Sequence, residues 1–329
     1  MRAHLFVFLA FAPAFAAPLR GEDPPPVNVP LPTLGGEQFW SDELVYQGWR
    51  IQQNVLTQHY RLLDPRDVRR AWGTAEQCRA AFAEFKRHEN LPPLSGRAVV
   101  TLHGLIRSRD HMDGLGKFLA EEGKYHVVNV SYASTRRSLD DHALSLSRVL
   151  AGLEGVEEID FVGHSLGNLV VRRYLGEASQ SEPRWQVDPR IKRMVMLGPP
   201  NNGARLAVLF RNNELFGLVT GPSGKQLARS WDECQKTLAT PSFPFGILAG
   251  GSGNDRGLNP LVPGDDDLIV SVEETRLAGA ADFRLLHCRH ALLMDDPAAR
   301  ACVLAFLQHG YFTAEGERQP IVVAAKAAP

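Results

Sequence analysis

The sequence has little charge imbalance and no long basic run. Its 329 residues carry 36 Lys and Arg against 37 Asp and Glu, so the formal net charge is -1. Proteins that bind nucleic acid usually present a basic patch or stripe to its phosphates, so we expect no nucleic-acid partner. The two arginine pairs, Arg136–Arg137 and Arg172–Arg173, are interpreted as solvated charges at helix ends rather than as a phosphate site.

Long apolar runs are also absent. Nowhere does the chain approach the roughly 18 consecutive apolar residues that a membrane-spanning helix needs. The amino terminus instead has Arg2, an apolar stretch that begins over Leu5–Phe11, and the small-residue pattern of Ala14–Ala16. This order is typical of a secretory signal peptide. We predict a signal peptide over residues 1–16, a secreted or periplasmic protein, and a proline-rich tether over residues 17–36; a retained amino-terminal anchor is the alternative.

Cysteine is scarce, with Cys78, Cys234, Cys288 and Cys302 only. In an exported protein four cysteines permit three full pairings, and the sequence does not choose among them. A Cys288–Cys302 bridge would hold the histidine at position 290, and a Cys78–Cys234 bridge would tie the amino-terminal segment to a later insertion. Both bridges are hypotheses.

Motifs for cofactors are missing. The glycine-rich stretch Gly250–Gly257 lacks the lysine and the following helix of a nucleotide-binding loop. The cluster His287–His290 contains metal-ligating residue types, but no second ligand pair at zinc spacing accompanies it. We therefore predict neither a metal nor an organic cofactor.

The most informative motif that is present is Gly163-His164-Ser165-Leu166-Gly167. It follows an apolar, strand-like run at Ile159–Val162 and opens a helix-like one. A strand that turns sharply into a helix needs residues without bulk two positions on either side of the turn. This context predicts that Ser165 is a nucleophile, raised on a strained elbow with its hydroxyl exposed.

A serine nucleophile needs a base, and the base needs an acid that orients it. Downstream of Ser165, the acids Asp265–Asp267 stand directly before an apolar turn, and a later strand-like run ends in His287 and His290. The chain order serine, acid, histidine suits a nucleophile elbow between strand and helix.

Four motifs together resemble the α/β-hydrolase serine esterases, most of all the small bacterial lipases and related lipid-ester hydrolases. They are Leu102–Leu105 after a strand, Gly163–Gly167, Asp267–Val270, and His290 before Ala291–Leu293. The resemblance runs from His103 to about Gly310. It implies a triad of Ser165, Asp267 and His290, with Asp265 and Asp266 as rivals for the acid and His287 for the base.

The same chemistry needs two backbone N–H donors for the oxyanion. One is Leu166, directly after the nucleophile. The resemblance places the other at Leu105, where the His103–Gly104 pair lets the backbone turn close to the substrate. His103 itself is expected to pack and hydrogen-bond beneath this loop.

From residue 96 the pattern alternates strand and helix, as a parallel sheet requires. We predict an α/β-hydrolase fold over residues 96–312, with a mostly parallel central sheet flanked by helices. The predicted strands are 98–102, 126–131, 159–162, 193–197, 245–249 and 283–287, and the predicted helices 113–121, 138–153, 166–175 and 297–308. Hydroxyls of the segment Tyr132–Arg137 are expected to cap the second of these helices.

Three further segments flank or interrupt this domain. Residues 37–95 are predicted to be an N-terminal helical extension with helices at Glu37–Leu63 and Thr74–His88, the second opened by a capping box of Thr74 and Gln77. This extension packs on the core or roofs the site. A cap or lid insertion is predicted at about 199–244, and residues 313–329 form a C-terminal tail.

The leading functional expectation is hydrolysis of carboxylic esters, lipid esters above all, through an acyl-enzyme, with transient contact to lipid surfaces. Since a histidine base must be neutral, the rate should fall below about pH 6. The same triad also serves acyl transfer and the cleavage of thioesters or amides. A hydrolase fold without activity, acting as a binding protein, is the alternative from another class.

Overall fold

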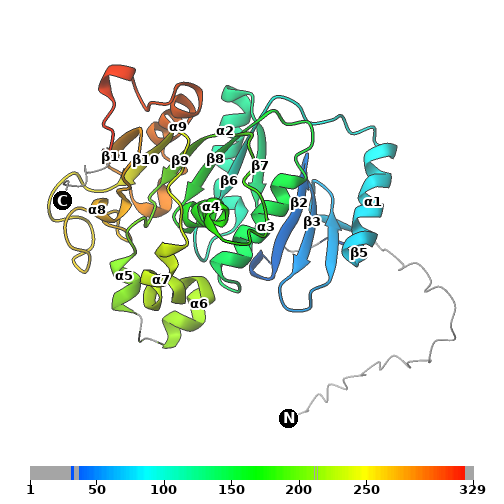
Figure 1. The fold of residues 1–329 in the computed structure, drawn as a ribbon, viewed down its shortest axis with the longest axis horizontal. Coiled ribbons are helices and arrows are strands. Elements are labelled where there is room, and N and C mark those ends of the chain that lie inside the picture. Colours follow the sequence, from blue (N-terminus) through cyan, green and yellow to red (C-terminus); the bar gives the residue numbers. More distant parts are fainter. Residues whose placement is uncertain (1–30, 33–36, 211, 213, 323–329) are drawn as a thin grey trace, which may run out of the picture.

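Six parallel strands form the central sheet of the computed structural model, which describes residues 31–32, 37–210, 212 and 214–322 (Figure 1). The strand order is β11-β10-β9-β8-β6-β7. The strands are β6 (Arg97–Leu102), β7 (His126–Val130), β8 (Glu158–His164), β9 (Ile191–Leu197), β10 (Phe245–Gly250) and β11 (Asp282–Leu286). All six predicted strands are therefore confirmed. Because strands buried on both faces are near-continuous apolar runs, they could be predicted from the sequence.

Helices cover both faces of this sheet. One face carries α2 (Asp113–Gly123) and α9 (Pro297–His309), and the other carries α3 (Leu139–Ala151) and α4 (Leu166–Gly176). All four helices were predicted. The predicted signal peptide and nearly all of the tether lie outside the described residues.

The N-terminal extension differs from the prediction, because its first part is a sheet and not a helix. Strands β1 (Leu31–Pro32), β2 (Trp40–Tyr46), β3 (Trp49–Asn54), β4 (Tyr60–Leu63) and β5 (Val68–Gly73) pair antiparallel in the order β1-β5-β4-β3-β2. A two-residue turn joins β2 to β3, with Gln47 at φ +48° and Gly48 at φ +84°. Positive φ at both positions is typical of the turn that closes a hairpin.

The predicted second helix of the extension is confirmed as α1 (Ala75–His88). Its capping box is present: the Gln77 N–H donates to the Thr74 hydroxyl at 3.3 Å, and the Thr74 N–H donates to Gln77 Oε1 at 2.9 Å. Helix α1 contributes Cys78 and Phe82 to the core.

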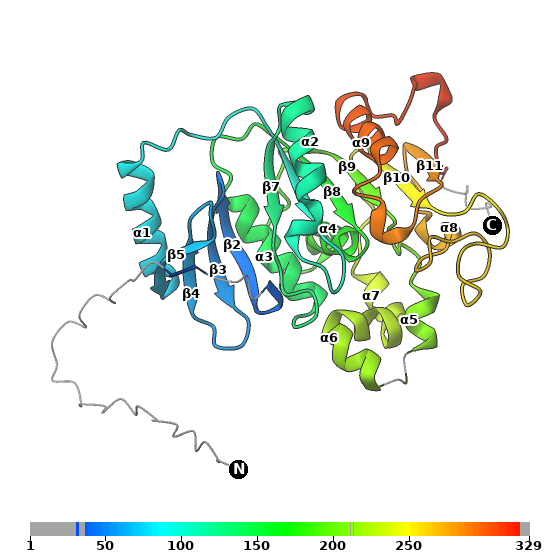
Figure 2. The same ribbon diagram turned by 180° about the vertical axis from the view of Figure 1, so that it is seen from behind.

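The N-terminal sheet lies beside the edge of the parallel sheet formed by β7, with α3 next to β2 (Figures 1 and 2). One hydrophobic cluster contains Ile51 and Leu62 of the N-terminal sheet together with Leu146 of α3 and Phe161 of β8. The extension therefore shares a core with the hydrolase domain.

The predicted cap consists of α5 (Arg205–Leu209), α6 (Glu214–Arg229) and α7 (Trp231–Lys236), which follow the carboxyl end of β9. Helix α6 is broken at Gly221, whose φ is +64°. A Cβ at this position would lie 1.6 Å from the Thr135 carbonyl oxygen, so only glycine permits this approach. Beyond the break, Ser223 donates to the Arg137 carbonyl at 2.9 Å.

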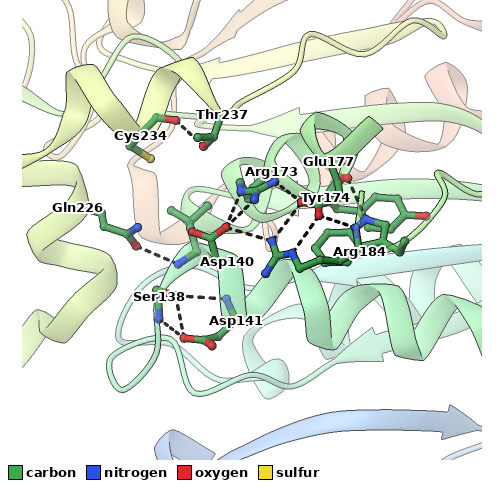
Figure 3. A network of polar contacts seen from close by, with 12 residues as sticks. Ser138, Asp140, Asp141, Arg173, Tyr174, Glu177, Arg184, Gln226, Cys234 and Thr237 are labelled. Carbon is green, nitrogen blue, oxygen red and sulfur yellow. Dashed lines mark hydrogen bonds and ion pairs between the residues drawn. The ribbon is translucent and has the colours of Figure 1, made fainter. Parts of the chain in front are cut away.

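The arginines at positions 172 and 173 of α4 are buried, which corrects the prediction that they are solvated. Arg173 contacts Asp140 of α3 at 2.6 Å and Glu177 at 3.0 Å, and Arg184 contacts Glu177 at 2.9 Å (Figure 3). The Arg173–Asp140 pair joins α3 to α4, and the sequence does not show it because the two residues are 33 positions apart.

Candidate active site

Ser165 occupies a strained elbow between β8 and α4. Its φ of +52° and ψ of -118° lie outside the regions that a serine ordinarily adopts. A Cβ at Gly163 would lie 2.4 Å from Asn168 Oδ1, and one at Gly167 would lie 2.5 Å from the Leu102 carbonyl oxygen. The elbow therefore requires both glycines. Its residues are buried except for Ser165, which is partly exposed, as a nucleophile must be.

His290 and Asp267 form a buried pair. His290 Nδ1 lies 2.6 Å from Asp267 Oδ2, and the two side chains are 9% and 0% exposed. The other carboxylate oxygen, Oδ1, accepts the N–H groups of Ile269 at 3.0 Å and Val270 at 2.8 Å. The backbone N–H of His290 also donates to the Asp267 carbonyl at 2.9 Å. With Nδ1–H donating to the carboxylate, Nε2 is left to act as the base.

The rival acids have other partners. Asp265 accepts hydrogen bonds from Ser252 and Gly253, and Asp266 accepts them from the backbone of Leu258 and Asn259. Each carboxylate therefore organises the loop that follows β10 rather than a histidine. Of the three acids, Asp267 is the one that the structure places against His290.

The rival base His287 is exposed and lies against this same loop. A Cβ at Gly253 would lie 2.4 Å from His287 Nε2. His287 is thus placed by the loop after β10, whereas His290 is placed by Asp267.

The elbow and the His290 loop meet at the carboxyl end of β9. Ser165 donates its N–H to the Leu197 carbonyl at 2.9 Å, and a Cβ on the next residue, Gly198, would lie 3.0 Å from His290 Nδ1. His164 donates from Nε2 to the His290 carbonyl at 2.9 Å, and the two rings lie 4.7 Å apart. His164 therefore ties His290 to the elbow, a role that sequence reasoning missed although the residue stands inside the motif.

Ser165 Oγ makes no hydrogen bond to any residue that the structure describes. In enzymes without bound substrate, catalytic hydrogen bonds are often long and shorten only in the complex. The elbow is therefore open to a substrate that approaches both the hydroxyl and the imidazole.

The expected oxyanion donors lie on two loops that flank Ser165. Leu166 is the first residue of α4, whose opening N–H groups have no partner within the helix. A Cβ at Gly104 would lie 3.2 Å from Ser165 Cβ, so the loop that contains Leu105 touches the nucleophile. Within the described part of the chain, neither the Leu105 nor the Leu166 N–H donates to a protein acceptor. Both are free to bind an oxyanion.

His103 supports this loop from below, as expected. It is 1% exposed, stacks on Tyr132 at 4.0 Å, and donates from Nδ1 to the Gly104 carbonyl at 2.9 Å. Burial lowers the pKa of His103 to about 4 and holds the pKa of His164 well below its ordinary value. Both rings are therefore neutral at physiological pH, and neither replaces His290 as the base.

The four cysteines are free in the structure, so neither hypothetical disulfide is formed. Cys78, Cys234 and Cys302 are buried, and Cys288 is partly exposed. The His290 loop is held by Asp267 and His164 instead.

Hydroxyls of the segment Tyr132–Arg137 do not cap α3, because Ser138 is the N-cap and forms a capping box with Asp141. Within residues 31–32, 37–210, 212 and 214–322, no helix combines the length and the apolar character needed to cross a bilayer.

The order of the parallel strands, with the elbow between the central strand β8 and helix α4, defines an α/β-hydrolase fold. Its structural neighbours are lipases and esterases of this fold.

No family model matches the sequence, and no curated protein matches it. Among solved structures, the mature lipase of Bacillus licheniformis is 15% identical, with a TM-score of 0.46 over 67% of this chain and 95% of the other. A phospholipase of Legionella pneumophila is 14% identical, with a TM-score of 0.47 over 66% and 60%. Naproxen esterase of Bacillus subtilis is 17% identical, with a TM-score of 0.39 over 66% and 85%. We infer the chemistry of the site from its own residues.

Proposed function

We propose that the protein is a serine hydrolase of carboxylic esters, in which Ser165, His290 and Asp267 form the catalytic triad. The observation that carries this proposal is the 2.6 Å pair of His290 and Asp267, anchored beside a serine at φ +52°. Such backbone strain persists only where the surroundings enforce it, and it concentrates at functional sites.

The reaction follows from these positions. His290 Nε2 removes the proton of Ser165 as Oγ attacks the ester carbonyl, and Asp267 stabilises the imidazolium that forms. The N–H groups of Leu105 and Leu166 bind the oxyanion. His290 then gives the proton to the leaving alcohol, and water hydrolyses the acyl-enzyme by the same sequence of proton transfers. No metal or organic cofactor takes part in these steps.

The surroundings of the triad favour an apolar acyl chain. Ile106, next to Leu105, is 53% exposed; Ile269, two residues after Asp267, is 42% exposed; and Leu292, two residues after His290, is 50% exposed. Val208 and Leu209 of helix α5, which follows β9, are exposed as well. Exposed apolar side chains on several loops of one site suit a hydrophobic ligand. Lipid esters are therefore the proposed substrates, and export from the cytoplasm would bring the protein to them.

A chain-length series of chromogenic acyl esters tests this proposal, with the wild type compared with Ser165→Ala. We expect a burst of alcohol released in proportion to the enzyme, followed by steady turnover, because acylation and deacylation are separate steps. The burst should vanish in the variant, and the rate should rise with acyl length. Equal activity in both proteins would remove Ser165 from the mechanism.

A second measurement locates the nucleophile directly. A fluorophosphonate should add one phosphonyl group to the wild type, and peptide mass spectrometry should find it on Ser165. Adduct on another serine, or none at all, would contradict the proposed triad even if some ester were hydrolysed.

A further inference from the structure

The loop that carries Leu105 is strained and needs support from outside. Ile106 has a φ of +62°, although a β-branched residue rarely adopts a left-handed conformation. The tight turn is closed by a 3.3 Å hydrogen bond from the Arg107 N–H to the Gly104 carbonyl. A strained turn of this kind relaxes unless its surroundings fix it, so the contacts on its far side matter.

One of those contacts comes from the N-terminal extension. The Gln38 side chain donates from Nε2 to the Arg107 carbonyl at 3.0 Å. Its Oε1 accepts from the Thr135 hydroxyl at 2.8 Å and from the Thr135 N–H at 3.1 Å. The Ser134 hydroxyl also reaches Oε1, at 3.3 Å. A single amide thus joins the Leu105 loop to the loop that follows β7.

The loop that follows β7 is itself fixed. Ser134 and Thr135 are 0% and 6% exposed. The Ser131 N–H donates to Asp42 Oδ2 at 2.7 Å, and the Ser131 carbonyl accepts the Asp42 N–H at 2.9 Å. Gln38 therefore holds the strained loop against a rigid neighbour, and the strand β2 that follows Gln38 holds that neighbour.

We propose that Gln38 is a positioning residue that keeps the Leu105 N–H aimed at the oxyanion, and that the N-terminal sheet completes the active site in this way. This inference rests on the proposed ester hydrolysis. It assigns a purpose to an extension that neither roofs the triad nor supplies a catalytic side chain. Gln38 has no role in binding the acyl group, so its loss should lower kcat and leave KM nearly unchanged.

Three variants separate this role from a general effect on folding. Gln38→Met keeps the size of the side chain and removes both halves of the bridge. Gln38→Glu keeps an acceptor for Thr135 but cannot donate to the Arg107 carbonyl. Gln53→Met is the matched control, because Gln53 lies on β3 of the same sheet and, among the described residues, its amide bonds to Gln58 alone, at 2.8 Å to the side chain and 3.4 Å to the carbonyl.

The measurements are kcat and KM on a short soluble ester, the affinity for an alkyl boronic acid that places an oxygen in the oxyanion hole, and the melting temperature. Loss of one oxyanion donor costs about a hundred- to a thousandfold in rate. Because the donor is displaced and not removed, we expect kcat to fall about tenfold in both Gln38 variants, with KM within about twofold. Boronate affinity should fall by the same factor, and Gln53→Met should match the wild type.

Unchanged kcat and boronate affinity in Gln38→Met would overturn the proposal, as would an equal loss in Gln53→Met. A wild type without Ser165-dependent hydrolysis would overturn the proposed function instead. Hydrogen exchange reads the positioning separately: the Arg107 amide, which donates to the Gly104 carbonyl, should exchange faster in Gln38→Met than in the wild type. Equal exchange would overturn the positioning role whatever the activity.

Discussion

The parallel sheet and the N-terminal sheet differ in where they place polar side chains. In the parallel sheet the functional groups follow the strands, on loops where Ser165 is partly exposed. In the N-terminal sheet several polar side chains lie inside: the charged Asp42 and Arg50 and the neutral Gln52 are 0%, 4% and 3% exposed. Polar groups at the ends of strands can meet a substrate, whereas buried ones can only bond to one another. The first sheet therefore carries the residues of the proposed reaction, and the second fixes how two parts of the chain meet.

The largest effect that we expect is the loss of kcat in Asp267→Asn, a variant in the loops of the parallel sheet. The two backbone N–H groups that bond to Asp267 Oδ1 would hold the amide oxygen of the asparagine, so its NH₂ group would face His290 Nδ1. Nδ1 would then have to accept a hydrogen bond, and the imidazole would adopt the wrong tautomer. We therefore expect kcat to fall about 10³- to 10⁴-fold. Steady-state kinetics on a soluble ester measure it. Asp265→Asn is the matched control, since this acid bonds to Ser252 and Gly253 and not to a histidine. A loss in Asp265→Asn as large as that in Asp267→Asn would contradict the assignment of the acid.

The next largest effect is a loss of folding stability when Asp42 of the N-terminal sheet is replaced. Arg50 lies 2.5 Å from Asp42, both are buried, and desolvation lowers the pKa of Arg50 in spite of this partner. In Asp42→Asn the Arg50 charge would stay buried without a counter-charge, which costs about 3–5 kcal/mol. Urea unfolding measures this loss.

The control for Asp42→Asn is an exposed ion pair in the hydrolase domain. Glu273 and Arg276 lie 2.9 Å apart, with side chains 81% and 42% exposed. Because water screens such a pair, Glu273→Gln should change stability by less than about 1 kcal/mol. Equal losses of stability in the two variants would show that the buried Asp42–Arg50 pair stabilises the protein no more than an exposed ion pair does.

The residue patterns predict the secondary structure of the hydrolase domain far better than that of the N-terminal extension. Each parallel strand is a short apolar run between turn residues, and the residues of the proposed triad stand directly after such runs or in the loops that follow them. In β2 and β3 the buried positions include Asp42, Arg50 and Gln52, so the alternation of apolar and polar residues that marks a half-buried strand is lost. The remaining apolar residues happened to fit a helical spacing. Partners such as Gln38 and Thr135 are 97 residues apart and leave no local signal.

Acid should destabilise the hydrolase domain through its buried histidines. Burial lowers the pKa of His103 to about 4 and that of His142 to about 3. In the unfolded chain histidine takes up a proton near pH 6.5, so the unfolded state binds more protons below that value. Stability is therefore intact above about pH 6.5 and falls as the pH drops toward 4, by several kcal/mol in total.

Urea unfolding of the wild type and His142→Gln between pH 7.5 and pH 4 checks this expectation. The variant should lose less stability over this range, because one buried imidazole no longer resists protonation. His59→Gln is the control from the N-terminal region, where the histidine is only partly buried and its pKa is lowered less deeply. Parallel curves for the wild type and His142→Gln would contradict the assigned cause.

The smallest effect expected is that of a reductant. Helix α1, which carries Cys78, lies on the outer side of the N-terminal sheet, whereas α7, which carries Cys234, lies in the cap (Figures 1 and 2). A disulfide needs Cα atoms within about 7 Å, so this pair cannot form one without moving a whole element. Burial raises the pKa of both thiols to about 11, which also keeps them unreactive. Since Cys288 and Cys302 are free in the structure as well, thiol titration of the denatured protein should find four thiols with or without prior reduction, and the melting temperature should not change. Fewer thiols before reduction would contradict this expectation, and only a bridge between Cys78 and Cys234 would mean that the N-terminal sheet and the cap are joined covalently.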